Sequence, residues 1–305
     1  MTPTQLAAAT LVIIAAVGVV AALLVGPLLR RRGGIDPGVV RARALSYAVL
    51  AGILAVAITI GLPALTVMFA AIAAVALLEW SRLADLPLHH VAALEVASLA
   101  IMIATAVHGA STADLLVGGL VLAGALMPVV RPDTNRAIRD FGLAAVGLII
   151  LSVMLAHGVA LAAERGESGV LLVAAVCLGC AGSDVGAFIV GKRFGSVPLA
   201  PALSPSKTRE GLIGNILGAA VGVAILAPAL SSVGGPLLLV GLVLIVAVGS
   251  VWGDLLESAA KREFGVKDAG SWLPGFGGIL DRVDSLLLAM PLTYWALRLA
   301  DLVTA

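Results

Sequence analysis

The sequence predicts an all-α, polytopic integral membrane protein with about ten transmembrane helices and a polar site at the cytoplasmic face. Hydrophobic residues make up 61% of the 305-residue chain, and its mean hydropathy is +1.13. Apolar runs of about 20 residues, long enough to cross a bilayer core, recur along the chain. These runs do not alternate as strands do, and in lipid only helices or closed barrels satisfy the backbone polar groups.

Ten apolar segments account for most of the chain, and each is predicted to be a membrane helix. The first segment is too long for the hydrophobic region of a signal peptide and lacks a basic start, so we expect it to remain as a helix. The ten segments span residues 6–29, 44–62, 64–80, 91–108, 114–130, 141–163, 169–190, 212–232, 236–256 and 285–303.

The distribution of lysine and arginine predicts how the chain is oriented in the membrane. With ten helices, 17 of the 19 basic residues fall in odd-numbered loops, and the two exceptions are Arg165 and Arg298. Basic residues accumulate on the cytoplasmic side, so the odd-numbered loops are predicted to be cytoplasmic and both termini external. A net charge of +1 without a basic tail gives no indication of nucleic-acid binding.

The two halves of the chain differ in the chemistry that they carry. Residues 1–140 are predicted to be a scaffold of membrane helices, in which Glu79 and Trp80 are interpreted as interfacial anchors at a helix end. Residues 141–305 contain every lysine of the chain, all in the seventh and ninth loops, where a compact cation can meet a phosphate. We therefore expect the site in the second half. The lysines are Lys192, Lys207, Lys261 and Lys267.

A proline-rich loop, residues 191–211, precedes the eighth apolar segment. Its three prolines forbid a long helix and stiffen the loop. The loop brings hydroxyl groups, a lysine and free backbone N–H groups to a helix start, and together these can bind an anion. A basic cytoplasmic loop with a helix cap is the alternative. The candidate residues are Ser204, Lys207, Thr208 and Glu210, with Asp184 upstream as either a water-facing residue or part of the same site.

A charged stretch between the last two apolar segments contains paired carboxylates. Asp281 and Asp284 are three residues apart, so a helix places both on one face, where they repel each other unless a cation lies between them. Asp254, at the end of the ninth segment, is expected at the same membrane depth. Oxygen ligands without His or Cys favour Mg²⁺. Capping of helix N-termini is an alternative explanation for Asp281 and Asp284.

The surroundings of these acids indicate a reaction class. Carboxylates for a divalent cation, next to lysine and arginine at a membrane surface, are typical of phosphoryl or nucleotidyl transfer. An anionic lipid phosphate can act as the nucleophile without a general base, which agrees with the lack of a suitable histidine. Gly277 and Gly278 permit a tight turn that brings the backbone close to a ligand.

Three segments of the chain match a known family. Residues 258–284, SAAKREFGVKDAGSWLPGFGGILDRVD, resemble the phosphatidate cytidylyltransferase signature SxxKRxxxxKDxGxxxPGHGGxxDRxD. The segments SPSKTREG (204–211) and SDVGAFIVGKRFG (183–195) resemble two further stretches of that family, so the match covers roughly residues 180–290. The resemblance implies that CTP and phosphatidic acid are converted into CDP-diacylglycerol and pyrophosphate, with Mg²⁺, in a cavity open to the cytoplasmic leaflet.

The resemblance also implies roles for individual residues. Phe276 departs from the pattern, because it replaces the His of PGHGG and so removes a hydrogen-bonding group, and Ser206 stands where Lys is frequent. Metal binding is implied for Asp254, Asp281 and Asp284. Catalytic roles are implied for Asp254, Lys261, Arg262, Lys267, Asp268 and Arg282, and substrate binding for Asp184, Ser204, Lys207, Thr208, Glu210, Gly277 and Gly278.

Two other functions are kept as alternatives. One is a cytidylyltransferase that acts on a different phospholipid or on a polyprenyl phosphate. The other is a lipid transporter, favoured by the helix count and by the acids Glu95 and Asp184, although transporters place polar groups near the bilayer midplane. The partners expected for the leading hypothesis are CTP and phosphatidic acid of the inner leaflet of a bacterial inner membrane, and a homodimer is left open.

Overall fold

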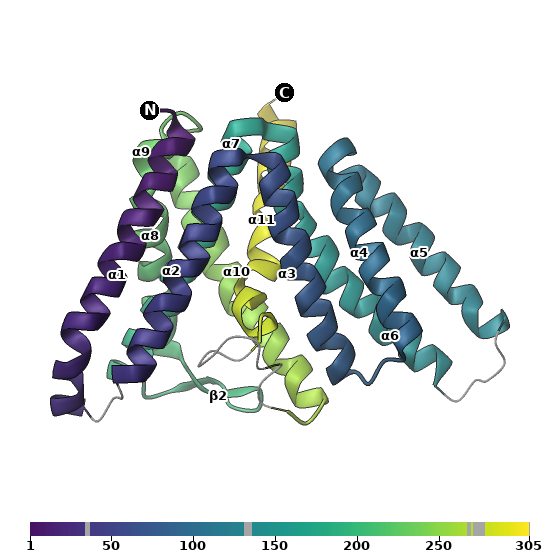
Figure 1. The fold of residues 1–305 in the computed structure, drawn as a ribbon, viewed down its shortest axis with the longest axis horizontal. Coiled ribbons are helices and arrows are strands. Elements are labelled where there is room, and N and C mark those ends of the chain that lie inside the picture. The colour runs from purple at the N-terminus through teal and green to yellow at the C-terminus, as the bar shows by residue number, and fades with distance from the viewer. Residues whose placement is uncertain (34–36, 131–135, 267–269, 271–277, 305) are drawn as a thin grey trace.

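The computed structural model describes residues 1–33, 37–130, 136–266, 270 and 278–304, and its elements are almost all helical (Figure 1). The long helices follow one another along the chain with few residues between them. A single two-stranded antiparallel hairpin interrupts the helices of the described residues. The elements are α1 (Pro3–Gly33), α2 (Pro37–Ile60), α3 (Leu62–Leu83), α4 (Leu88–His108), α5 (Ala110–Val130), α6 (Ala137–Gly147), the π-helical η1 (Leu148–Val153), α7 (Met154–Phe194), β1 (Pro198–Ala200), β2 (Ser204–Thr208), α8 (Arg209–Ile225), α9 (Ala227–Leu230), α10 (Pro236–Glu263) and α11 (Leu280–Thr304).

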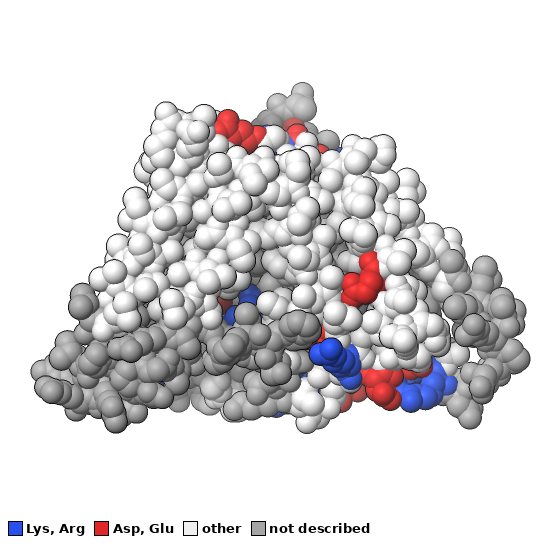
Figure 2. Space-filling model, in the orientation of Figure 1, with Lys and Arg blue, Asp and Glu red and all other residues white. Residues whose placement is uncertain are grey.

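Six helices in the described residues are long and apolar enough to cross a membrane, which confirms the prediction of a helical, multi-pass protein at that level. Two shorter apolar helices, Ala44–Ile60 and Ala110–Leu120, accompany them. The viewed face of the molecule is largely uncharged, and most charged side chains gather at its two ends (Figure 2). The six candidate spans are Pro3–Val20, Leu62–Leu83, Leu88–His108, Ala137–Phe194, Pro236–Glu263 and Leu280–Val303.

The two ends of the bundle are built differently. Both chain termini lie at one end, which we call the terminal end, and the β1–β2 hairpin lies at the other, the hairpin end (Figure 1). At the terminal end, α2 passes into α3 through Gly61 alone, and α4 passes into α5 through Gly109 alone. The continuous helical stretch from α6 to α7 reverses at Gly166, whose φ of 57° and ψ of −131° are not helical. All three glycines have positive φ, which other residues adopt only with strain.

Glycines also bring helices into backbone contact. On α7 and α8, Gly182 faces Gly218 and Gly186 faces Gly214, and a Cβ at any of these positions would overlap the carbonyl oxygen of its partner. Small residues at four-residue spacing allow such close approach between membrane helices. On α10, a Cβ at Gly253 would likewise overlap the carbonyl oxygen of Asp284 on α11. These contacts hold α7 against α8 and α10 against α11 near the hairpin end.

The hairpin is the one feature of this architecture that the apolar pattern did not indicate. β1 and β2 pair antiparallel, with Pro198 opposite Thr208 and Ala200 opposite Ser204. The backbone N–H of Arg209 donates to the carbonyl oxygen of Val197 at 2.8 Å, which extends the pairing to the start of α8. The hairpin thereby holds the segment before α8 across the end of the bundle.

Candidate functional site

Three carboxylates from two helices converge at the hairpin end. Asp254 and Glu257 lie three residues apart on α10 and therefore share one face, and Asp284 lies in the first two turns of α11. One carboxylate oxygen of each lies within 4.8 Å of the others. The side chains of Glu257 and Asp284 are buried, with residue exposures of 3% and 8%. Buried acids this close together require compensating positive charge.

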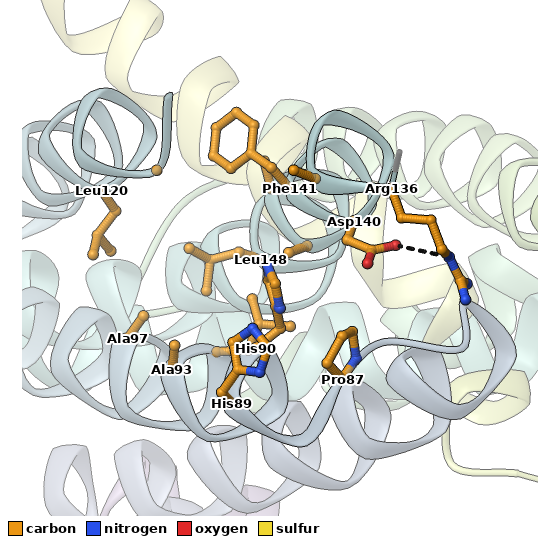
Figure 3. Close-up of a pocket in the computed structure, with 15 residues that line it drawn as sticks. Pro87, His89, His90, Ala93, Ala97, Leu120, Arg136, Asp140, Phe141 and Leu148 are labelled. Carbon is orange, nitrogen blue, oxygen red and sulfur yellow. Dashed lines mark ion pairs between the residues drawn. The ribbon is translucent and has the colours of Figure 1, made fainter. Parts of the chain in front are cut away.

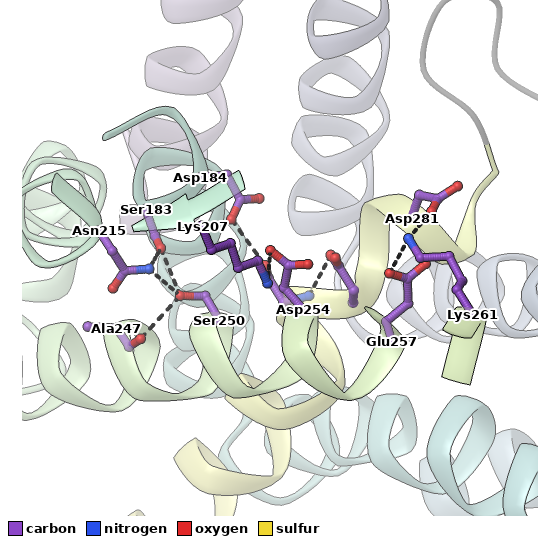
Figure 4. A network of polar contacts seen from close by, with 12 residues as sticks. Ser183, Asp184, Lys207, Asn215, Ala247, Ser250, Asp254, Glu257, Lys261 and Asp281 are labelled. Carbon is purple, nitrogen blue, oxygen red and sulfur yellow. Dashed lines mark hydrogen bonds and ion pairs between the residues drawn. The ribbon is translucent and has the colours of Figure 1, made fainter. Parts of the chain in front are cut away.

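Two lysines supply part of that charge (Figure 4). Lys207, at the end of β2, places its buried Nζ 2.6 Å from Asp254 Oδ2. Lys261, one turn beyond Glu257 on α10, places Nζ 2.5 Å from Glu257 Oε2 and 2.7 Å from Asp281 Oδ1. Four carboxylates thus lie next to two ammonium groups, so the acids outnumber the lysines here.

The donor set of this group fits a divalent cation such as Mg²⁺. The converging atoms are all carboxylate oxygens, the ligands that Mg²⁺ prefers, and the acids outnumber the lysines that pair with them. The three residues that converge are Asp254, Glu257 and Asp284. Asp281, which the sequence also suggested as a ligand, lies outside this trio and accepts from Lys261 and from the Gly278 N–H, at 2.7 and 2.9 Å. Its role as a metal ligand stays a prediction.

Asp184 approaches the group from α7. Its Oδ1 accepts from Ser285 Oγ at 3.1 Å, which places it beside Asp284 on α11. The neighbouring Ser183 belongs to a buried polar network behind the site, where its Oγ lies 2.7 Å from Ser250 Oγ, and Asn215 bonds to both serines (Figure 4). This network joins α7, α8 and α10, because each helix contributes one of its members. It fixes the helix faces on which Asp184 and Asp254 lie.

The predicted phosphate-binding loop forms β2 and the start of α8. Thr208 is the N-cap of α8, and its Oγ1 accepts from the Gly211 N–H at 3.2 Å. Glu210 accepts from Ser196 Oγ and from the Val197 N–H, and the bond from Ser196 lowers the pKa of the Glu210 carboxyl to about 2. Both residues therefore order the loop that presents Lys207. Ser204 is half-buried at the other end of β2.

The remaining residues suggested by the sequence fall into two groups. Arg262 is exposed, and its guanidinium donates to the carbonyl oxygens of Leu203 and Val266, at 3.2 and 3.3 Å, so it ties the hairpin to the end of α10. Arg282 lies in the first turn of α11. Lys267, Asp268, Phe276 and Gly277 lie outside the described residues.

Comparison with known proteins decides the family. The model of the "Cytidylyltransferase family" matches residues 41–300, most of the chain. This chain belongs to the cytidylyltransferase family. The resemblance found in the sequence is thereby confirmed.

Several relatives of this chain are named phosphatidate cytidylyltransferase. The protein of Brucella suis is 36% identical over 183 residues, which are 59% of this chain and 64% of the relative. That of Bacillus subtilis is 41% identical over 134 residues, 44% of this chain and 49% of the relative. The Escherichia coli protein named "Uncharacterized protein YnbB" is 36% identical over 133 residues, 43% of this chain and 44% of the relative. The chain thus covers less than two-thirds of the length of each of these three relatives.

Two residues that touch the site escaped the sequence analysis. Glu257 could have been found, because it lies three residues after Asp254 on the same helix and therefore on the same face. Glu79 carried no such local signal, since its contacts lie about 200 residues away: its carboxylate accepts from the N–H groups of Ile279 and Leu280, at 3.1 and 2.8 Å. Glu79 and Trp80 are 1% and 5% exposed, so their interpretation as interfacial anchors is wrong.

A separate cavity of about 420 Å³ lies between α4, α5 and α6, away from the carboxylates (Figure 3). Its walls are mainly apolar, with Ala93, Leu94 and Leu148 among them. Polar groups line another part of it, where Asp140 accepts from Arg139 at 3.1 Å. None of the residues suggested by the sequence lines this cavity.

Proposed function

We propose that this cytidylyltransferase transfers the cytidylyl group of CTP to phosphatidic acid, which yields CDP-diacylglycerol and pyrophosphate. The observation that supports it best is the group of Asp254, Glu257 and Asp284 with two lysines at one end of an apolar helical bundle. Such an arrangement suits a phosphate-bearing lipid that stays in the membrane and a nucleotide that comes from water. The names of the Brucella and Bacillus relatives agree with this substrate pair.

In the proposed reaction, an oxygen of the lipid phosphate attacks the α-phosphorus of CTP. The new P–O bond forms as the bond between the α-phosphorus and the bridging oxygen to the β-phosphate breaks, and pyrophosphate leaves with that electron pair. The lipid phosphate is already ionised, so no general base is needed. Bound Mg²⁺ would supply positive charge next to the phosphates.

The residues of the chain position these groups and balance their charge. Asp254, Glu257 and Asp284 would hold the metal ion. Lys207, on the hairpin, pairs with Asp254 and would bind a phosphate of CTP through the same ammonium group. Lys261 keeps Glu257 and Asp281 in place through its two ion pairs. Because the Lys261 ion pairs stay in place, they would require no reorganisation as charge develops in the transition state.

We extend the proposal to the membrane topology. The ten apolar segments would all cross the membrane, including the two on either side of Gly166, with the hairpin end facing the cytoplasm. The excess of basic residues in the loops of that end supports this orientation. CTP would then reach the site from the cytoplasm, and phosphatidic acid from the inner leaflet.

The direct test uses the purified full-length protein in lipid nanodiscs with labelled CTP, Mg²⁺ and phosphatidic acid. Formation of a labelled lipid that co-migrates with CDP-diacylglycerol, together with release of pyrophosphate, is expected. If neither phosphatidic acid nor any other lipid acceptor receives the label from CTP, the proposed transfer reaction is wrong.

The acceptor is the part of the proposal that the sequence itself keeps open, because Phe276 replaces the His of the family signature. A panel of phosphatidic acid, other anionic phospholipids and a polyprenyl phosphate separates the alternatives. Phosphatidic acid is expected to give the highest kcat/KM, and Phe276→His is expected to leave that ranking unchanged. If a polyprenyl phosphate gives a higher kcat/KM than phosphatidic acid, the proposed substrate is wrong and the polyprenyl phosphate takes its place.

A further inference from the structure

The C-terminal end of α3, in the half of the chain without lysines, contacts both ends of the segment that joins α10 to α11, residues 264–279, which lies within the family signature. At the near end of that segment, the ring of Trp80 meets the ring of Phe264 edge to face, with centroids 5.5 Å apart. At its far end, the Glu79 carboxylate accepts from the Ile279 and Leu280 N–H groups. We call Glu79 and Trp80 the α3 clamp.

The space that Glu79 occupies exists because two neighbours are glycines. A Cβ at Gly278 would lie 2.5 Å from Glu79 Oε2, and a Cβ at Gly270 would overlap Oε1. Real Cβ atoms do not approach other atoms this closely, so a side chain at either position would push the carboxylate away from the N–H groups that it accepts. Gly270 and Gly278 therefore leave room for the Glu79 carboxylate.

The clamp is itself held rigidly by the neighbouring helix. Trp80 Nε1 donates to the carbonyl oxygen of Leu143 on α6 at 2.9 Å, and Gly147 leaves room for the indole ring, because a Cβ there would lie 2.5 Å from it. Glu79 and Trp80 are buried. Because the α3 clamp is fixed in this way, it can hold the start of α11 in one defined position, which a flexible side chain could not do.

What Glu79 holds is the beginning of α11. A carboxylate on the first N–H groups of a helix satisfies donors that have no partner within the helix and interacts favourably with the helix dipole. α11 starts at Leu280, so its first two turns carry Asp281 and Asp284. The Asp281 carboxylate in turn accepts from the Gly278 N–H. A change at Glu79 therefore affects residues that lie within about one helical turn of Asp281 and Asp284.

We propose that Glu79 is a positioning residue that sets the place of Asp281 and Asp284 relative to Asp254 and Glu257. It touches neither substrate nor metal ion and acts through the start of α11. This inference rests on the proposed metal site and thus on the proposed function. Residues that orient metal ligands from behind change metal affinity or activity about 10–100-fold when they are altered.

The chain offers a matched control at the terminal end. Glu164 accepts from the Ala110 N–H, at the first residue of α5, at 3.0 Å, and its carboxylate also lies against a glycine, Gly109. Glu164→Gln and Glu79→Gln therefore remove the same kind of helix-capping charge, once away from the site and once beside it. Both variants are purified as full-length chains in nanodiscs.

The first readout is the rise of the unfolding temperature with Mg²⁺ concentration, which needs no turnover. Half of the maximal rise is expected at about 10–100-fold more Mg²⁺ in Glu79→Gln, and at an unchanged concentration in Glu164→Gln. The second readout is the Mg²⁺ dependence of cytidylyl transfer, with the same expectation. Equal Mg²⁺ dependence in Glu79→Gln and the wild type, or an equal weakening in both variants, overturns the inference.

A second variant covers the case in which Glu79→Gln does not fold. Gly278→Ala keeps the Glu79 charge and displaces its carboxylate, so it is expected to weaken Mg²⁺ stabilisation in the same direction. An unchanged Mg²⁺ response in folded Gly278→Ala also overturns the inference. Failure of the proposed function would look different, because wild-type protein would then be stabilised by Mg²⁺ without transferring the nucleotide.

Discussion

The two ends of this molecule use the same local device for different purposes. At each end, a glutamate from one helix caps the start of another beside a glycine: Glu79 with Gly278 at the hairpin end and Glu164 with Gly109 at the terminal end. At the terminal end, Glu164 pairs with Arg298 and Asp301 with Arg165, whereas Glu167 accepts from the hydroxyl of Thr4. At the hairpin end, four carboxylates share two lysines. The convergence of carboxylates, two of them buried, rather than the presence of charge, distinguishes the site.

The strongest challenge to this comparison is to neutralise one acid at each end. Asp284→Asn is expected to lower cytidylyl transfer on the order of 10²–10³-fold, because it removes fixed charge from the centre of the site. Asp301→Asn is expected to change turnover by no more than about twofold, since an exposed ion pair contributes little. Turnover is measured with labelled CTP at equal amounts of membrane-inserted protein. An Asp284→Asn variant with half of the wild-type rate would contradict the assignment.

Lysines at the hairpin end sharpen the comparison further. Lys207→Gln is expected to raise the KM for CTP about 10–100-fold, the effect of losing one hydrogen bond to a charged group. Lys192, at the end of α7, lies over the Phe188 ring at 5.5 Å and serves as the control, so Lys192→Gln is expected to leave KM unchanged. Initial rates over a range of CTP concentrations test both. Equal KM values in the two variants would show that the position of Lys207 on the hairpin has no role in binding CTP.

A smaller effect separates the trio of carboxylates from the ligand set that the sequence suggested. Glu257→Gln is expected to weaken Mg²⁺ stabilisation about tenfold, and Asp281→Asn to weaken it less, because Asp281 lies outside the converging trio and pairs with Lys261. The unfolding temperature at increasing Mg²⁺ concentrations distinguishes them. A larger effect for Asp281→Asn would restore the set of Asp254, Asp281 and Asp284.

The smallest effect on activity is expected at the terminal end. Gly166→Ala forces a Cβ into a backbone conformation with positive φ, which costs about 1–3 kcal/mol of stability, although no atom lies within 4 Å of that Cβ. The kcat and KM of the folded protein should not change. Gly241→Ala in α10, also without an atom within 4 Å, is the control that should not be destabilised. A changed KM in Gly166→Ala would show that the two ends are coupled.

The sequence predicted the helical architecture well because its signals are local. The apolar runs coincide with helices, and even the reversal between residues 163 and 169 falls at Gly166. The hairpin was not predicted, because its strands are three and five residues long and depend on pairing with each other. The prolines indicated correctly that no long helix runs there.

The candidate site was predictable only in part, for a similar reason. Asp254 and Asp284 were recognised, and α10 and α11 bring them together. Their partner Glu257 was readable from helical spacing, whereas the pairing of Asp281 with Lys261 depends on how two helices pack. No local pattern could connect Glu79 with Leu280, because that contact is purely tertiary. The division of the chain into a scaffold, residues 1–140, and a catalytic half stays a prediction.

The α3 clamp also has a consequence for the order in which the protein is made. Glu79 leaves the ribosome 200 residues before Ile279, which at 5–20 residues per second means about 10–40 s earlier. During that interval, its carboxylate lacks the two N–H groups from which it accepts hydrogen bonds in the folded protein. α11 therefore both contributes Asp284 to the site and supplies the start of a helix that Glu79 caps. A chain that stops before Ile279 would lack both N–H groups from which Glu79 accepts in the folded protein.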